Sequence, residues 1–144
     1  MWRRVALCLL PLAAMTGCTT IGDFPPDGRA PVSVACKQGV ACNVAVGSEC
    51  FTFLCKALVA EEVNIERGET RAATTLTWHL PQATELRFAS DGIVFDAAGF
   101  SCHQLNAKEF QCVDSAEVGR HKYTVRLEWR GHSFRPLDPW VVNK

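Results

Sequence analysis

Apolar and polar residues alternate along most of the chain after residue 31. The clearest case is residues 122–130, in which Tyr123, Val125, Leu127 and Trp129 alternate with polar or charged residues. This period of two predicts a half-buried antiparallel strand, because successive side chains of a strand point to opposite faces. Shorter alternations of the same kind occur at residues 32–34, 42–46, 51–55, 63–66, 75–80, 86–88 and 93–95.

Turn-forming residues separate these stretches. We expect turns at residues 46–48, 67–68 and 90–92, and an end to one strand at Pro81. Residues 54–62 are the one place where a short helix is expected. Many short strands divided by turns predict an all-β domain in which two antiparallel sheets pack as a sandwich.

Two aromatic residues make this expectation more specific. Trp78 lies centrally in a middle strand, as the core tryptophan of immunoglobulin-like domains does. Residues 114–123 resemble the approach to a tyrosine corner, in which a tyrosine hydroxyl bonds back to the backbone. Their spacing is longer than usual and no cysteine follows Tyr123, so an antibody-type domain is not implied; Tyr123 can equally be the first inward residue of its strand.

The start of the chain has a different pattern. Arg3 and Arg4 precede an uncharged apolar run at residues 5–15, which is shorter than the roughly 20 residues of a membrane-spanning helix. The run ends in Met15-Thr16-Gly17-Cys18. This ending resembles the lipobox of bacterial lipoproteins, which implies a signal peptide at residues 1–17 and acyl chains such as palmitate on Cys18. A plain signal peptide cleaved near Gly17 is the alternative.

The resemblance also implies a place in the cell. Thr19 stands where an aspartate tends to keep such lipoproteins in the inner membrane, so we expect the outer membrane, facing the periplasm. Residues 18–31 then form the lipidated cysteine and a proline-rich tether, and residues 32–144 form the sandwich. Over residues 57–142 the chain resembles the small immunoglobulin-like lipoproteins of bacterial envelopes, most of which have no assigned activity.

The charge of the chain argues against one class of partner. The sequence holds 15 basic and 15 acidic residues, and removal of Arg3 and Arg4 would leave 13 against 15. Bulk binding of nucleic acid needs a basic face, so we expect no nucleic-acid partner. A membrane is expected as a partner only through the lipid.

Six cysteines of the expected mature domain form an even set, which in an exported protein predicts three disulfides. Cys102 and Cys112 flank a predicted hairpin with residues 106–108 at its turn, and we expect them to face each other. The other four cysteines allow two arrangements. Nested bonds, Cys36–Cys55 and Cys42–Cys50, suit a hairpin turning at residues 46–48, whereas local bonds, Cys36–Cys42 and Cys50–Cys55, are the alternative.

No catalytic or cofactor motif is present in the sequence, and we expect neither an enzyme nor a metal or other cofactor. No G-x-S-x-G elbow, glycine-rich phosphate loop or H-E-x-x-H motif occurs. The carboxylates of residues 61–69 are interpreted as a solvated face. His79 and His121 could meet across adjacent strands, although outward polar positions on a sheet explain them equally well.

Two groups of residues are candidate binding elements. Leu105 and Lys108 lie at the tip of the Cys102–Cys112 hairpin, where they would insert into a partner unless Leu105 folds back onto the domain. Lys122, Arg126 and Arg130 form a basic row that would meet an anionic surface unless Glu85 and Glu62 neutralise it.

These features together predict a non-enzymatic binding or assembly module with a protein partner in the envelope. The alternative is an inhibitor or immunity lipoprotein that blocks a periplasmic hydrolase or toxin, with residues 99–111 as its inserting loop.

Overall fold

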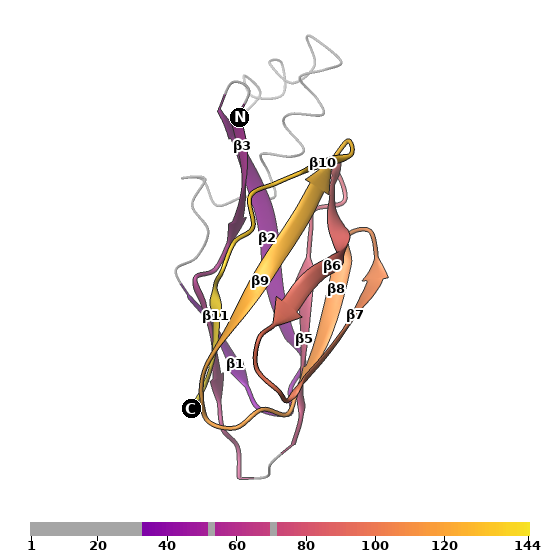
Figure 1. Cartoon of the computed structure of the whole chain (residues 1–144). Helices are drawn as coiled ribbons and strands as arrows, with labels where there is room; N and C mark the ends of the chain where they lie inside the picture. The colour runs from indigo at the N-terminus through magenta and orange to yellow at the C-terminus, as the bar shows by residue number, and fades with distance from the viewer. Residues whose placement is uncertain (1–32, 52–53, 70–71) are drawn as a thin grey trace, which may run out of the picture.

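The computed structural model describes residues 33–51, 54–69 and 72–144, and every regular element in these ranges is a strand. No helix in this part is long and apolar enough to cross a membrane. Figure 1 shows most of the strands running along the length of an elongated molecule. The strands are β1 (Ser33–Lys37), β2 (Cys42–Phe51), β3 (Leu54–Val59), β4 (Glu62–Glu66), β5 (Thr74–His79), β6 (Leu86–Phe95), β7 (Phe100–Asn106), β8 (Glu109–Asp114), β9 (Gly119–Trp129), β10 (His132–Ser133) and β11 (Trp140–Asn143).

The strands form two sheets. One has the order β1-β4-β11-β9-β10 with β6 also paired to β9, and the other has the order β3-β2-β5-β8-β7. The all-β, disulfide-stabilised sandwich expected from the sequence is confirmed. Most neighbours are antiparallel, but β1–β4, β4–β11 and β2–β5 are parallel. β1 and β2 belong to different sheets, so they do not pair with each other as a hairpin. β1 pairs with β4 and β2 pairs with β5, and both of these pairs are parallel.

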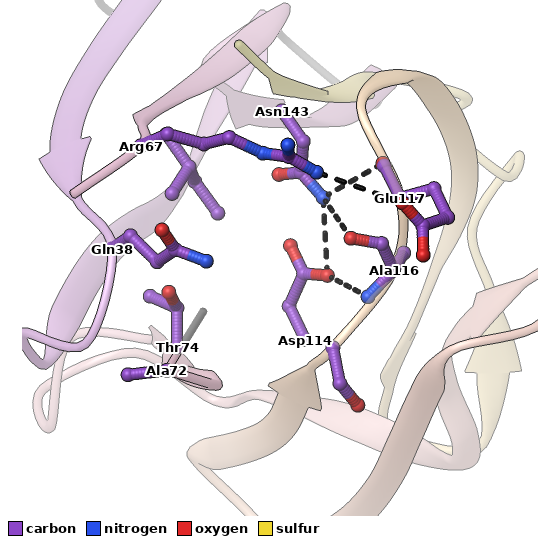
Figure 2. Close-up of a pocket in the computed structure, with 10 residues that line it drawn as sticks. Gln38, Arg67, Ala72, Thr74, Asp114, Ala116, Glu117 and Asn143 are labelled. Atoms are coloured by element: carbon purple, nitrogen blue, oxygen red, sulfur yellow. Dashed lines mark hydrogen bonds and ion pairs between the residues drawn. The ribbon is translucent and has the colours of Figure 1, made fainter. Parts of the chain in front are cut away.

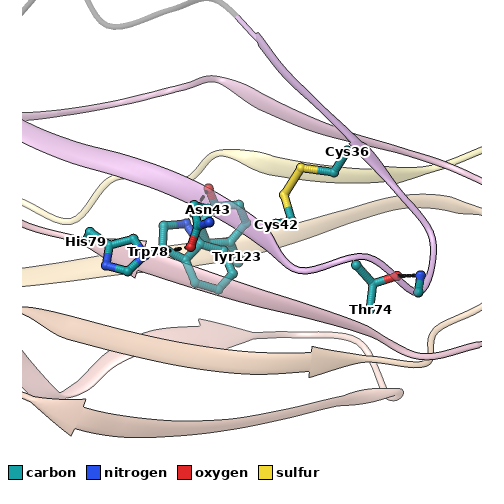
Figure 3. The surroundings of a disulfide bond; sticks show 8 residues. Cys36, Cys42, Asn43, Thr74, Trp78, His79 and Tyr123 are labelled. Carbon is teal, nitrogen blue, oxygen red and sulfur yellow. Dashed lines mark hydrogen bonds between the residues drawn. A yellow bond between two sulfur atoms is a disulfide. The ribbon is translucent and has the colours of Figure 1, made fainter.

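The inward side chains of both sheets form one apolar core. Trp78 of β5 is 0% exposed, and Tyr123, Val125 and Leu127 of β9 are buried as their alternation predicts. The indole N–H of Trp78 donates a hydrogen bond to the Tyr123 hydroxyl at 3.2 Å (Figure 3). Tyr123 therefore points inward from β9, and its hydroxyl forms a hydrogen bond with the Trp78 indole rather than with the backbone.

Two local predictions between residues 42 and 62 are wrong. No turn occurs at residues 46–48, since β2 continues through them, and residues 54–59 form β3 rather than a helix. Val46 pairs with Val59 and Gly47 with Leu58 along an antiparallel ladder. Pairing with a neighbouring strand outweighs the weak local preference of this segment.

The turn predicted at residues 90–92 is a β-bulge. β6 runs from Leu86 to Phe95, and its register against β9 shifts between Phe88 and Ile93. A Cβ atom at Gly92 would lie 2.9 Å from both the Ala89 carbonyl oxygen and the Phe88 Cβ. Glycine is required there because the bulge brings the backbone too close for a side chain.

Two disulfides are present among the described side chains. The expected Cys102–Cys112 bond joins directly opposed residues of β7 and β8. Cys36 is bonded to Cys42, so the nested arrangement is wrong and the local one holds for this pair. A short turn between β1 and β2 brings the Cα atoms of these two cysteines to 5.7 Å, and the disulfide between them links the two sheets (Figure 3). Cys50 and Cys55 are opposed in the β2–β3 register, but their side chains lie outside the described part.

Candidate functional site

The β7–β8 hairpin is fixed at both its base and its tip. The Cys102–Cys112 disulfide closes the base. At the tip, the Leu80 N–H donates to the Lys108 carbonyl oxygen at 2.8 Å and the Phe88 N–H donates to the Ala107 carbonyl oxygen at 2.9 Å. The hairpin is thus held by its neighbour β6 and by the residue after β5, and its tip does not depend on the turn alone for its shape.

Leu105 projects from this hairpin. It is 45% exposed, one of four large apolar side chains that are exposed among the described residues, the others being Val40, Val94 and Val118. The β7–β8 register shifts between Gln104 and Asn106, so Leu105 lies at an irregularity of an edge strand. Such irregularities turn a side chain out of its regular direction. Leu105 therefore does not fold back into the core.

Lys108, the other predicted contact residue of the tip, is directed inward. Its ammonium group donates to the carbonyl oxygens of Thr84 and Leu86. Partial burial, helped by the nearby Arg87, lowers the pKa of Lys108 from its ordinary value. The prediction of an outward contact at Lys108 therefore needs correction: its ammonium group anchors the tip to the start of β6.

The basic row of β9 is neutralised. Each residue of the row forms an ion pair: Lys122 with Asp138 at 3.5 Å, Arg126 with Asp91 at 3.6 Å and Arg130 with Glu85 at 2.9 Å. The bidentate hydrogen bond from Arg130 holds the pKa of Glu85 below its usual range. Glu62, expected as a second neutralising residue, pairs with Arg120 instead. The basic row therefore forms ion pairs on a solvated face of the sheet and is not a free anion-binding patch.

The histidines considered as a pair do not meet. His79 belongs to the five-stranded sheet, with Nε2 2.8 Å from the Asn43 side-chain oxygen. His121 belongs to the other sheet and contacts the Glu117 carbonyl oxygen. Nowhere in the described ranges do three or more His, Cys, Asp or Glu side chains come together as metal ligands would.

A small polar cavity that the sequence analysis missed lies at one end of the sandwich (Figure 2). It has a volume of about 60 Å³ and lies between the ends of β8 and β11 and the segments around Gln38 and Arg67. Asp114 and Asn143 are 5% and 7% exposed and line it. The signal that could have found Asp114 is its alternation with Phe110 and Cys112, which places all three on the inward face of β8.

The carboxyl group of Asp114 is only partly satisfied. Its Oδ1 accepts hydrogen bonds from the Ala116 N–H at 2.9 Å and from Asn143 Nδ2 at 3.2 Å. Asp114 Oδ2 and Asn143 Oδ1 are both buried and have no hydrogen-bond partner within the described structure. Burial raises the pKa of Asp114, and the two hydrogen bonds to Oδ1 oppose that rise.

Two larger hollows lie elsewhere on the surface. One, of about 540 Å³, is lined by Trp140 and Arg120 among others, and the Arg120 guanidinium stacks 4.5 Å from the Trp140 ring centre. The other, of about 310 Å³, lies beside β6 and β7 and is lined by Phe95 and Phe100, whose rings stack at 3.6 Å. Neither contains a constellation of groups typical of catalysis.

Comparison with known proteins assigns no family. No family model and no curated protein matches the chain. A solved structure of a cysteine protease inhibitor from Entamoeba histolytica aligns with 76% of this chain and 97% of its own, at 12% identity and a TM-score of 0.38. A likeness at that level assigns neither a family nor a function to the present chain.

Proposed function

We propose that the protein is a lipid-anchored, non-enzymatic binding module of the bacterial envelope that contacts a protein partner through Leu105. The observation that carries the proposal is the exposed apolar side chain of Leu105 on a hairpin that is fixed at its base and at its tip. A pre-organised element loses less conformational entropy when it binds, so an apolar tip of this kind suits insertion into a partner's groove. The disulfide and the inward Lys108 supply that rigidity.

The anchor and location are part of the same proposal. Cys18 and the tether lie outside the described residues, and the lipobox-like sequence supports them. Lipid on Cys18 would hold the sandwich at the periplasmic side of the outer membrane. Cys18→Ser is expected to abolish palmitate labelling and to release the domain as soluble protein; labelling that persists in the variant contradicts the anchor.

The contact at Leu105 is tested by a photoreactive amino acid placed at position 105 in living cells. A defined crosslinked band is expected from position 105 and not from position 94, where Val94 is also exposed but lies on β6. Leu105→Asp in an otherwise native chain should abolish capture of the same partner while Val94→Asp should not. Equal crosslinking at both positions, or capture unaffected by Leu105→Asp, contradicts a role for the tip.

The substitution Lys108→Glu is unsuitable for this test. It would remove the bonds to the Thr84 and Leu86 carbonyl groups and loosen the hairpin itself. Identification of the crosslinked partner also separates the two functional classes. A hydrolase that loses activity when the purified domain is added supports the inhibitor alternative, and a partner without such activity supports an assembly role.

A further inference from the structure

The contact between Asp114 and Asn143 connects the two sheets at the end of the sandwich. Asp114 ends β8 of the five-stranded sheet, and Asn143 ends β11 of the six-stranded sheet. Asn143 Nδ2 also lies 3.4 Å from the Ala116 carbonyl oxygen and 3.5 Å from that of Glu117. These contacts fix the orientation of the amide, because its NH2 group faces three acceptors.

The two unpartnered atoms are the remaining oxygens of this same pair. Figure 2 shows the carboxyl and the carboxamide facing each other, with Asp114 Oδ2 and Asn143 Oδ1 on the same side of the bond that joins the groups. Both oxygens are acceptors when Asp114 is ionised. Two buried acceptors without a donor cost free energy, because each has lost its hydrogen bonds to water and gained none in the fold. A single proton on Asp114 Oδ2 removes both deficits.

We propose that the folded protein holds a proton on Asp114 Oδ2, donated in a hydrogen bond to Asn143 Oδ1, at pH values where an exposed aspartate is ionised. The carboxylic acid and the amide then form a ring of two hydrogen bonds across the two sheets. Each of the two oxygens has less than 1 Å² of exposed area, so solvent does not supply the missing hydrogen-bond donor at its surface.

The charged groups around the pair oppose this assignment only weakly. Arg67 and Glu117 line the cavity and are 3.7 Å apart, so they largely balance each other. His121 of β9 lowers the pKa of Asp114, but its influence is smaller than that of burial or of either hydrogen bond to Oδ1. Gln38 and Thr74, on the remaining walls, are neutral. Desolvation is the largest influence, and it favours the neutral acid.

The proton makes stability depend on pH in a defined direction. A carboxyl whose pKa is raised on folding binds its proton more tightly in the folded state. The contribution is complete below the unfolded value, near the ordinary 3.8, and is lost as the pH rises through the folded value. Each unit of difference changes the folding equilibrium constant tenfold.

The direct test is the titration of the Asp114 carboxyl carbon by NMR in the full mature chain. The expected midpoint lies at least about one pH unit above that of the exposed Asp91, measured in the same sample. A midpoint at or below that of Asp91 overturns the proposal. This measurement needs no variant, so it holds even where a substitution impairs folding.

Asp114→Asn supplies the second test, since its amide can donate permanently where the acid holds its proton. Between about pH 4, near the ordinary carboxyl value, and about pH 8, the wild type should lose melting temperature, and Asp114→Asn should lose less. Asp91→Asn is the matched control and should keep the wild-type slope. An unchanged slope in Asp114→Asn overturns the proposal, as does a rise in wild-type melting temperature with Ca²⁺ at pH 8 that Asp114→Asn lacks.

Discussion

In the described part of the chain, the two sheets meet through buried polar side chains at two places, and the two contacts differ in chemistry. In the middle, Trp78 of β5 donates to Tyr123 of β9; at the end, Asn143 of β11 donates to Asp114 of β8. Both bonds measure 3.2 Å. Burial raises the pKa of Tyr123 and keeps it neutral, whereas the end contact includes a carboxyl group with an unpartnered oxygen. Hydrogen bonds of equal length can therefore join groups that differ in their sensitivity to pH.

The packing around each contact explains the difference. The Trp78 ring lies 5.2 Å from that of Tyr123 and 6.3 Å from that of Phe95, so most of the middle contact is apolar. The end contact borders a polar cavity and depends on hydrogen bonds for its stability.

The largest effect is expected from Trp78→Ala, which removes the central apolar contact. Truncation of a fully buried tryptophan should lower the free energy of unfolding by about 3–5 kcal/mol, as measured by urea denaturation. His79→Ala, one residue along on the outward face of β5, should cost about 0.5 kcal/mol or less. Equal losses at the two positions would show that both faces of β5 are covered.

Removal of the Cys102–Cys112 disulfide tests whether its contribution to stability depends on pH, as the contribution of the proton on Asp114 is expected to do. The double variant Cys102→Ala/Cys112→Ala should lower the free energy of unfolding by about 2–3 kcal/mol, since a short closed loop in the unfolded chain is released. The loss should be the same at pH 5 and pH 8, because no titrating group is removed. A loss confined to one of these pH values would mean that the disulfide supports the Asp114 contact two residues away.

Tyr123→Phe should produce a smaller loss, of about 1–2 kcal/mol. The ring stays in the core, but the buried indole N–H of Trp78 loses its acceptor. Because the hydroxyl remains neutral, the loss should not vary between pH 5 and pH 8. Chemical denaturation at both values checks this, and a pH-dependent loss would contradict a purely neutral contact in the middle of the sandwich.

The smallest effect is expected on the surface of β9. Lys122→Gln and Arg126→Gln each remove one exposed ion pair, and each should change the melting temperature less than Tyr123→Phe does. Raising the salt concentration should reduce even that difference, because exposed charges are screened. A large loss would mean that the row carries more of the sheet's stability than its exposure implies.

The fold was largely predictable because alternation records which side of a strand is buried. Tyr123, Val125 and Leu127 are inward as expected, and Trp78 lies in the core. The errors occurred where pairing partners decide the structure. Gly47 lies in the middle of β2 rather than in a turn because β3 pairs alongside it, and Gly92 belongs to a bulge because β6 stays paired with β9 on both sides.

The candidate sites were less predictable, because side-chain direction depends on contacts between distant residues. The hairpin and its disulfide could be expected from spacing, yet only the contact with β6 shows that Lys108 is directed inward. The basic row was visible in the sequence, whereas its ion pair with Asp91 depends on a strand pairing more than 30 residues apart.

The sequence by itself determined the alternation, the disulfide across the hairpin and the buried tryptophan, because these follow from local periodicity and short separations. Only the tertiary structure decided which sheet each strand joins and which polar groups meet between the sheets. Asp114 and Asn143 are 29 residues apart. They meet because β11 inserts between β4 and β9, and no local pattern around either residue specifies that insertion.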